Sequence, residues 1–278
     1  MAWKTQVVDR VPTYAGRVKM TPVSGQTNVY DLERADSPIT EGTPINAALL
    51  NQKADRLVEG VTVYVSKSGS DVTGTGASSA PFATIQAAVD ALPKNLGGFH
   101  AQIDIGAGTY NERVQIDGFT GGRLTLGVSG RAVVVSGISV WSSCLVRLNI
   151  PNITWATGQT GAMLYLGAGS QVAIMSNMII NGGNQSVIGI SAEQGSSLVT
   201  AGTAVTVDSC ASTAVAATTG AKIAFNRIAG SGNTAGALRA DNGAVISYAV
   251  RTLEGTTLFT TSGGGRIFGG SQTNPAEY

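Results

Sequence analysis

Apolar residues recur at a fixed spacing over the C-terminal two-thirds of the chain. Eight anchor residues, six of them glycine, mark a repeat of about 23 residues, at His100, Gly121, Ser143, Gly169, Gly195, Gly220, Gly243 and Gly264. Three positions after each anchor stands a branched aliphatic residue: Ile103, Leu124, Val146, Val172, Leu198, Ile223, Ile246 and Ile267. Five positions before the anchors, all residues but the first are apolar: Asn95, Ile116, Ile138, Leu164, Ile190, Val215, Leu238 and Phe259. Each unit thus holds two apolar stretches joined by a turn.

Within each unit the apolar positions alternate with a period of two, which is typical of a strand with one buried face. One such unit cannot bury its own apolar face, whereas stacked units pair strand on strand and build one continuous core. Leucine-rich repeats share the period, but their consensus is missing here. The repeat therefore predicts an all-β chain folded as a parallel β-helix, a solenoid of about eight coils.

Two amphipathic helices are expected before the repeat. In EGTPINAALLNQKADRL, Thr43 is the predicted N-cap and Pro44 the first helical residue of a helix that ends near Gly60. In PFATIQAAVDALP, the stretch between Pro81 and Pro93 presents one apolar face, formed by Phe82, Ile85, Val89 and Leu92. We expect this second helix to cover the first coil, whose strand edges would otherwise stay unpaired.

The composition and the predicted elements together give a chain of three parts. Residues 1–60 form a small N-terminal domain, in which alternating stretches at 17–20 and 28–32 predict strands. Residues 61–97 hold a capping strand, a polar loop and the capping helix, and residues 98–278 hold the β-helix. No acidic residue occurs between Asp117 and Glu193, which favours a surface of Ser, Thr, Asn and Gly.

Charge and residue counts exclude several kinds of site. The net charge is +1 and charged residues make up 13% of the chain, about half the ~25% of typical soluble domains, so we expect no nucleic-acid binding. With His100 as the single histidine and Cys144 and Cys210 as the only cysteines, one chain cannot fill a Cys and His zinc site. We expect no metal, no cofactor, and no membrane insertion, since no apolar run approaches ~18 residues.

Two segments resemble known families. Residues 63–116, from VYVSKSGSDVTGTG to IDIGAGTYNERVQI, are similar to the opening of right-handed β-helix proteins of the pectin-lyase-like superfamily, including bacteriophage tail spikes. The segment ADSPITEGTPINAALLNQKA resembles the start of tail-fibre and receptor-binding proteins from phages and prophages of Gram-positive hosts. The motif that carries this second resemblance is Gly42, Thr43, Pro44, Ile45 and Asn46.

These resemblances imply a right-handed β-helix on the outside of a virion, in its tail or another appendage. They imply that residues 1–60 attach to other tail or baseplate proteins, and that host cell-surface polysaccharide is the ligand. The GTYNE segment, residues 108–112, also resembles pectin methylesterases, but the later catalytic motifs of those enzymes are missing from the acid-free stretch.

A ladder of turn residues is the predicted binding site. Two positions before each anchor stand Gly98, Phe119, Trp141, Gly167, Glu193, Thr218, Asp241 and Ser262. Aromatic faces stack on sugar rings and carboxylates accept hydrogen bonds from sugar hydroxyls, so the predicted glycan-binding residues are Phe119, Trp141, Glu193 and Asp241. The alternative is that these are ordinary turn residues, with the aromatic rings covering the rod or a subunit interface.

Glu193 and Asp241 are also the candidate catalytic residues. They lie two coils apart, about 9.6 Å at ~4.8 Å per coil, near the ~6.5–9.5 Å that separates the carboxyl groups of inverting glycosidases. Three functions therefore stay open: a receptor-binding fibre or spike without enzymatic activity, a polysaccharide depolymerase, and a purely structural virion fibre or head decoration.

The C-terminal end suggests assembly. The last coil carries Leu258, Phe259, Ile267 and Phe268, and no capping helix follows it in the sequence. An uncapped β-helix end is a template for aggregation. We therefore expect a homotrimer in which residues 258–278 are partly buried between chains.

Overall fold

The computed structural model describes residues 56–272 without a break and, before them, residues 11–12, 18–22, 24, 30–34 and 38–40. The chain divides into two compact units, Ala2–Ala54 and Asp55–Tyr278, the latter together with Met1. The predicted helix after Thr43, as far as residue 55, and the attachment motif Gly42, Thr43, Pro44, Ile45 and Asn46 lie outside the described residues. The predicted end of that helix near Gly60 is wrong, because residues 56–60 are not helical and Arg56 forms a parallel β-bridge with Asn95.

Four short strands are described in the N-terminal unit. Strand β1 (Val11–Pro12) pairs antiparallel with β4 (Pro38–Thr40), and β2 (Val18–Pro22) pairs antiparallel with β3 (Tyr30–Arg34). The predicted strands at 17–20 and 28–32 overlap β2 and β3.

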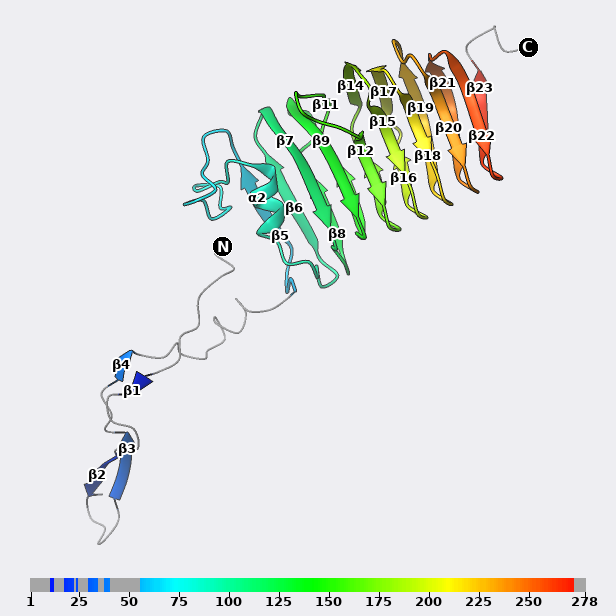
Figure 1. The fold of residues 1–278 in the computed structure, drawn as a ribbon. Helices are drawn as coiled ribbons and strands as arrows, with labels where there is room; N and C mark the ends of the chain where they lie inside the picture. The colour runs from blue at the N-terminus through cyan, green and yellow to red at the C-terminus, as the bar shows by residue number, and fades with distance from the viewer. Residues whose placement is uncertain are drawn as a thin grey trace. The chain divides into compact units, whose positions relative to one another are not determined.

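Residues 56–272 form a parallel β-helix, as the repeat predicts (Figure 1). One parallel sheet winds around three faces, which we call A, B and C in chain order. Face A consists of β5 (Val61–Val65), β6 (His100–Ile105), β8 (Arg123–Leu126), β10 (Leu145–Leu148), β13 (Gln171–Ile174), β16 (Ser197–Thr200) and the first halves of β19 (Lys222–Gly230), β21 (Val245–Leu253) and β23 (Arg266–Gln272).

Faces B and C complete each coil. Face B holds the first halves of β7 (Gly108–Asp117) and β9 (Val133–Trp141), then β11 (Asn152–Thr154), β14 (Met178–Gln185), β17 (Ala204–Cys210) and the second halves of β19, β21 and β23. Face C holds the second halves of β7 and β9, then β12 (Ala162–Gly167), β15 (Ile188–Ala192), β18 (Thr213–Ala217), β20 (Gly236–Asp241) and β22 (Thr257–Ser262).

The predicted aliphatic columns form the core. The first column is almost completely buried at Ile103, Leu124, Val146, Val172, Leu198, Ile223 and Ile246, and is half-buried at Ile267 in the last coil. On face C, Ile138, Leu164, Ile190, Val215 and Leu238 pair in register and are likewise buried. Stacked aliphatic side chains inside parallel strands therefore hold the rod together.

The predicted register of the first coil is wrong by two residues. Ile103 pairs with Leu126, and Ala101 occupies the place opposite Leu124. The turn of this coil is built on Gly98 rather than His100. Gly98 has a φ of +90° and its N–H donates to the carbonyl of Gly121 in the next coil. A glycine tolerates this backbone conformation, which a histidine rarely adopts.

The anchor glycines are explained by one turn between faces C and A. At Gly169, Gly195, Gly220 and Gly243, φ lies between +71° and +74°, and the residues before them, Ala168, Gln194, Thr219 and Asn242, have φ between +50° and +52°. Two consecutive left-handed residues reverse the chain sharply, and glycine is favoured at such positions. The repeat seen in the sequence is thus the repeat of this turn.

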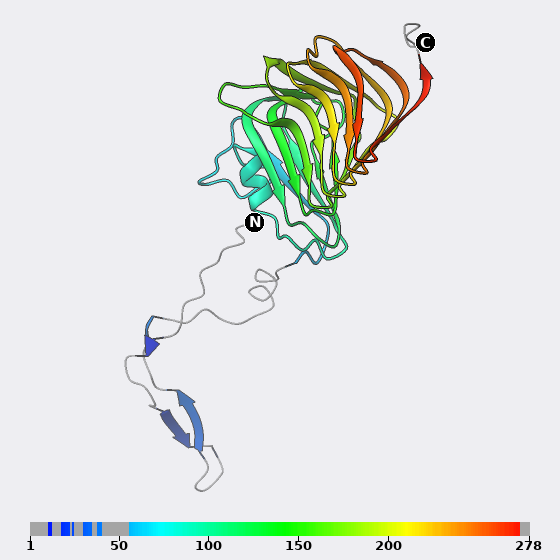
Figure 2. The ribbon, with the colours of Figure 1, turned by 45° about the vertical axis from the view of Figure 1, so that its right-hand side comes forward.

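Helix α2 (Ile85–Asp90) covers the first coil (Figure 2). It begins after the N-cap Thr84, later than the predicted opening at Pro81, and all four predicted apolar positions are buried. Its Gln86 side chain accepts from the N–H of Gln115 at 2.7 Å and donates to that residue's carbonyl at 3.1 Å. The helix therefore takes the place that a face C strand would have beside β7.

This helix explains why the rod has about seven coils and not eight. Face C begins only at β7, because α2 occupies the position before it. At the other end of the rod lie β22 and β23 (Figure 2). There Phe268 is 53% exposed, and Phe259 and Ile267 are half-buried. Within residues 56–272 no helix covers that end.

Candidate functional site

The predicted ladder exists at the outer edge of face C. Buried Ile116, Val140, Leu166 and Ala192 point inward, so the residue that follows each of them points outward. Trp141 pairs in register with Asp117 on one side and with Gly167 on the other, and Asp241 pairs with Ser262. We call the outward set the edge ladder: Asp117, Trp141, Gly167, Glu193, Thr218, Asp241 and Ser262.

Phe119 was predicted as part of this ladder, and that prediction is wrong. Its side chain is fully buried. The turn after β7 is two residues longer than the corresponding turns and contains Gly118 and Gly121 with positive φ, which returns Phe119 to the interior. The exposed Asp117, not Phe119, is the neighbour of Trp141 on the ladder.

Trp141 lies on a support of neighbouring residues. It is 39% exposed, and its ring centroid lies 4.6 Å from that of Tyr165 at an interplanar angle of 37°. A Cβ atom at Gly167 would come within 2.8 Å of the Trp141 ring and 2.9 Å of the Tyr165 ring. Gly167 therefore leaves the space in which the two rings meet, and one face of the indole is fixed while the rest stays accessible to a ligand.

Glu193 continues this cluster across the next coil. Its Oε2 accepts from the Tyr165 hydroxyl at 3.1 Å and its Oε1 accepts from the Ser191 hydroxyl at 3.2 Å. The Glu193 backbone N–H donates to Ser196 Oγ at 3.0 Å, which ties the residue to the turn. Trp141, Tyr165 and Glu193 thus form one connected group over β9, β12 and the turn after β15.

The environment of Tyr165 shows the effect of the carboxylate. Burial, together with the charge of Glu193 and the hydrogen bond to it, raises the pKa of Tyr165 to about 12. The phenol is therefore neutral and a hydrogen-bond donor at physiological pH.

Asp241 has a different environment from Glu193. Its Oδ1 accepts from Ser262 Oγ at 2.8 Å, and its Oδ2 lies 3.3 Å from Nε of Arg239. Because Thr218 occupies the ladder position between Glu193 and Asp241, the two carboxylates do not share a partner. The structure places both residues on the predicted ladder but does not bring them into one group.

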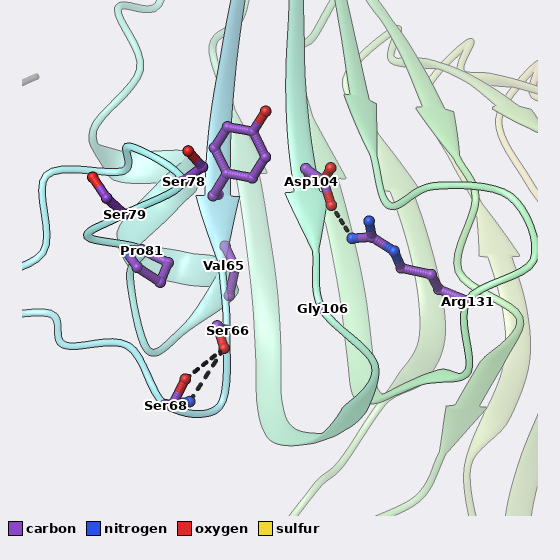
Figure 3. A pocket seen from close by; sticks show the side chains of 10 residues that line it. Val65, Ser66, Ser68, Ser78, Ser79, Pro81, Asp104, Gly106 and Arg131 are labelled. Carbon is purple, nitrogen blue, oxygen red and sulfur yellow. Dashed lines mark hydrogen bonds and ion pairs between the residues drawn. The ribbon is translucent and has the colours of Figure 1, made fainter.

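A separate pocket of about 400 Å³ opens near the capped end (Figure 3). Its walls are formed by Tyr64, Val65, Ser66, Ser68, Ser78, Ser79, Pro81, Asp104, Gly106 and Arg131. Arg131 forms an ion pair with Asp104 and also donates to the carbonyl of Ile105 at 3.1 Å. The pocket offers hydroxyl groups and an internally neutralised ion pair, which suits a small neutral polar group.

His100 and Asp71, the one acidic residue of the loop between β5 and α2, have structural contacts. His100 Nε2 lies 2.8 Å from Thr125 Oγ1, and burial, with the charges of Arg123 and Arg147, lowers the pKa of His100. Asp71 accepts from the backbone of Ala83 and Thr84. In the described part of the chain, no three His, Cys, Asp or Glu side chains gather in a way that could hold a metal ion.

No helix among the described residues has the length and apolar character needed to cross a bilayer. Comparison with known proteins adds no relative: no protein-family model, curated protein or solved structure matches the chain. The resemblance to phage proteins accordingly stays a prediction.

Tyr165 and Asp117 are the site residues that the sequence analysis missed. Tyr165 stands at the outward position two residues before Gly167, so the strand alternation in Ala162–Gly167 could have indicated it. Asp117 was hidden by the longer turn, since a fixed offset from Gly121 selects Phe119 instead.

Proposed function

We propose that the chain is a carbohydrate-binding component of an external appendage of a phage or phage-like particle, which recognises host cell-surface polysaccharide without cleaving it. The observation that carries this proposal is the supported, accessible ring of Trp141 beside Tyr165 and Glu193. Aromatic faces bind the apolar faces of sugar rings, and adjacent carboxylates accept hydrogen bonds from sugar hydroxyls.

The rigidity of the site supports this function. The three residues stand on adjacent coils whose strands are held in register by parallel pairing. A binding group that is ordered before the ligand arrives loses little conformational entropy on binding. The extended, open face also suits a polymer better than a small molecule, because it has no end walls.

The depolymerase alternative has less support. An inverting glycosidase needs two carboxyl groups that act on the same glycosidic bond. Glu193 and Asp241 instead have separate partners, Tyr165 and Ser191 for the first and Ser262 and Arg239 for the second. Thr218 lies between them on the ladder. A purely structural role would leave the accessible indole and its glycine support without a use.

The place of the protein on a particle rests on the sequence resemblance. We propose that residues 1–60, through the motif at 42–46, attach the chain to tail or baseplate proteins, and that three chains assemble so that weak sites act together. Linked sites increase avidity without any new contact. This assigns the protein to the outside of a virion.

Binding of the full chain to a panel of purified bacterial wall and capsular polysaccharides by biolayer interferometry tests the function. We expect binding without release of reducing ends, and its loss in Trp141→Ala. Phe99→Ala is a matched control, since Phe99 is 40% exposed and lies off the ladder. Release of reducing ends would establish the depolymerase, and no binding to any polysaccharide would favour the structural fibre.

A further inference from the structure

Trp141 stands between two carboxylates on the edge ladder. Asp117 is its register partner in the preceding coil and is exposed. Glu193 lies two coils further along and is held by the hydroxyl of Tyr165, which itself packs against the indole. At ~4.8 Å per coil, Asp117 lies about 5 Å from Trp141 on one side and Glu193 about 10 Å on the other, so an oligosaccharide lying along the ladder brings successive sugar units to the two acidic groups.

The nearest cationic groups of face C are already engaged. Arg113 is half-buried, with Nε donating to Ser139 Oγ at 3.0 Å and Nη2 to the carbonyl of Ala162 at 2.6 Å. Arg239 stands further along the rod, where it faces Asp241. Lys94, in the loop beside the turn after Asp117, has its Nζ 4.2 Å from the Phe119 ring centroid. The seven ladder positions themselves therefore hold three carboxylates and no cationic side chain.

An aromatic face flanked by carboxylates is the chemistry that recognises an organic cation. The ring quadrupole attracts an ammonium group placed over its face, and each carboxylate adds a charge pair. Burial is the main cause of the raised pKa of Tyr165, and the charge of Glu193 adds to it.

We infer that the edge ladder around Trp141 selects sugars that carry a free, protonated amine over their neutral or N-acylated counterparts. This inference rests on the proposed function and names the ligand class within it. A neutral oligosaccharide would use only the ring and the hydrogen bonds, whereas successive units of an amino-sugar oligomer would also pair with Asp117 and Glu193.

Calorimetric titration of the full chain with two oligosaccharides of equal length tests the inference. One is a glucosamine oligomer with free amines and the other is its fully N-acetylated form. We expect the amine form to bind roughly tenfold more tightly, the sum of an exposed cation–π contact and two exposed charge pairs. Added salt should weaken only the amine form.

Single substitutions separate the contribution of the two carboxylates from that of the Trp141 ring. Asp117→Asn and Glu193→Gln should each reduce the preference for the amine form, while Glu254→Gln, an exposed acid off the ladder, should leave it unchanged. Gly167→Ala should weaken both ligands, because its Cβ displaces the indole without changing any charge. Circular dichroism confirms that each variant is folded.

The possible outcomes distinguish the amine preference from the carbohydrate binding on which it rests. Equal affinity for the two oligomers, or binding of neither while another polysaccharide of the panel binds, overturns the amine preference and leaves carbohydrate binding intact. Failure of every polysaccharide and both oligomers overturns both. An amine preference that survives in Asp117→Asn and Glu193→Gln would also overturn the assignment to the ladder.

Discussion

The hydroxyl of Tyr165 donates a hydrogen bond of 3.1 Å to Oε2 of Glu193 across the boundary between two coils. This bond joins an aromatic residue in the middle of a strand to a carboxylate at a turn, and the pKa of Tyr165 rises to about 12 in this environment. Its energetic consequences can be measured separately from any ligand.

In Glu193→Gln we expect the pKa of Tyr165 to fall part of the way toward its ordinary value, because burial, the larger cause of its rise, remains. The substitution removes the charge that opposes phenolate formation and weakens the acceptor. Ultraviolet titration of the phenolate, with Tyr165→Phe subtracted as the reference, measures the change. An unaltered titration in Glu193→Gln would mean that burial alone sets the pKa.

The same group makes a contribution to stability that depends on pH. Because the folded-state pKa lies above the ordinary value of 10.0, the neutral phenol favours the folded state. The contribution is complete below about pH 10 and is lost as the pH rises toward about 12. Urea unfolding at several alkaline pH values should show a shallower loss of stability in Tyr165→Phe than in the native chain.

Two adjacent residues of β16 test which side chains of the strand point into the core and which point outward. Leu198 is completely buried, and Leu198→Ala should lower the free energy of unfolding by about 2–5 kcal/mol, because a cavity is left in the core. Val199 is 47% exposed, so Val199→Ala should change it by less than about 0.5 kcal/mol. Similar losses in the two variants, measured by denaturant unfolding, would contradict the register.

Gly195 tests the turn that repeats along the rod. It has a φ of +71°, and a Cβ atom there would meet no other atom within 4 Å. Gly195→Ala should therefore destabilise the fold by about 1 kcal/mol through the backbone alone. Gly195→Asn should cost less, since asparagine tolerates left-handed backbone. Equal unfolding midpoints for both variants and the native chain would refute this account.

Gln86 tests the cap. Gln86→Ala removes both hydrogen bonds to the backbone of Gln115 and should cost about 1–2 kcal/mol. Hydrogen exchange should rise first in β7, whose edge loses its partner. Gln171→Ala is the control, because Gln171 is exposed on face A and belongs to a middle coil, far from the cap. Faster exchange spread evenly over all coils would argue against a local capping role.

The predicted homotrimer is tested at the open end. Light scattering of the full chain should give about three times the 28.2 kDa of one chain, and Phe268→Ser should shift the population toward monomer. Phe99→Ser, at the capped end, should not. A native chain that stays monomeric and soluble at micromolar concentration would rule out this assembly.

The fold was predictable because the same pattern of buried aliphatic residues recurs in every coil. Leu198 and its equivalents recur after glycines whose positive φ the turn requires, so one signal reports both packing and backbone geometry. The number of coils was overestimated, because nothing in the sequence says that α2 replaces a strand beside β7. The cap itself was visible in the buried face that includes Val89.

The site was only partly predictable, because it depends on the outer register. Trp141 and Glu193 were found from their offset to the anchors, since their turns have equal length. The turn after Asp117 is longer, so the same offset from the anchor selects Phe119, whose side chain is buried in the core. The contact between Trp141 and Tyr165 joins residues on different coils, and it becomes apparent only when the strands are aligned.

The helix that covers one end of the rod also limits what the uncovered end can do. Open-ended polymers form when one end of a molecule accepts the opposite end of the next. Here α2 covers face C of the leading end, and the backbone of Gly76 and Phe82 hydrogen-bonds with Tyr64 at the outer edge of β5. A second rod that brought its β22 and β23 to this end would meet a helix and a loop instead of open strands, which protects a protein built of stacked strands from becoming a fibril by this route.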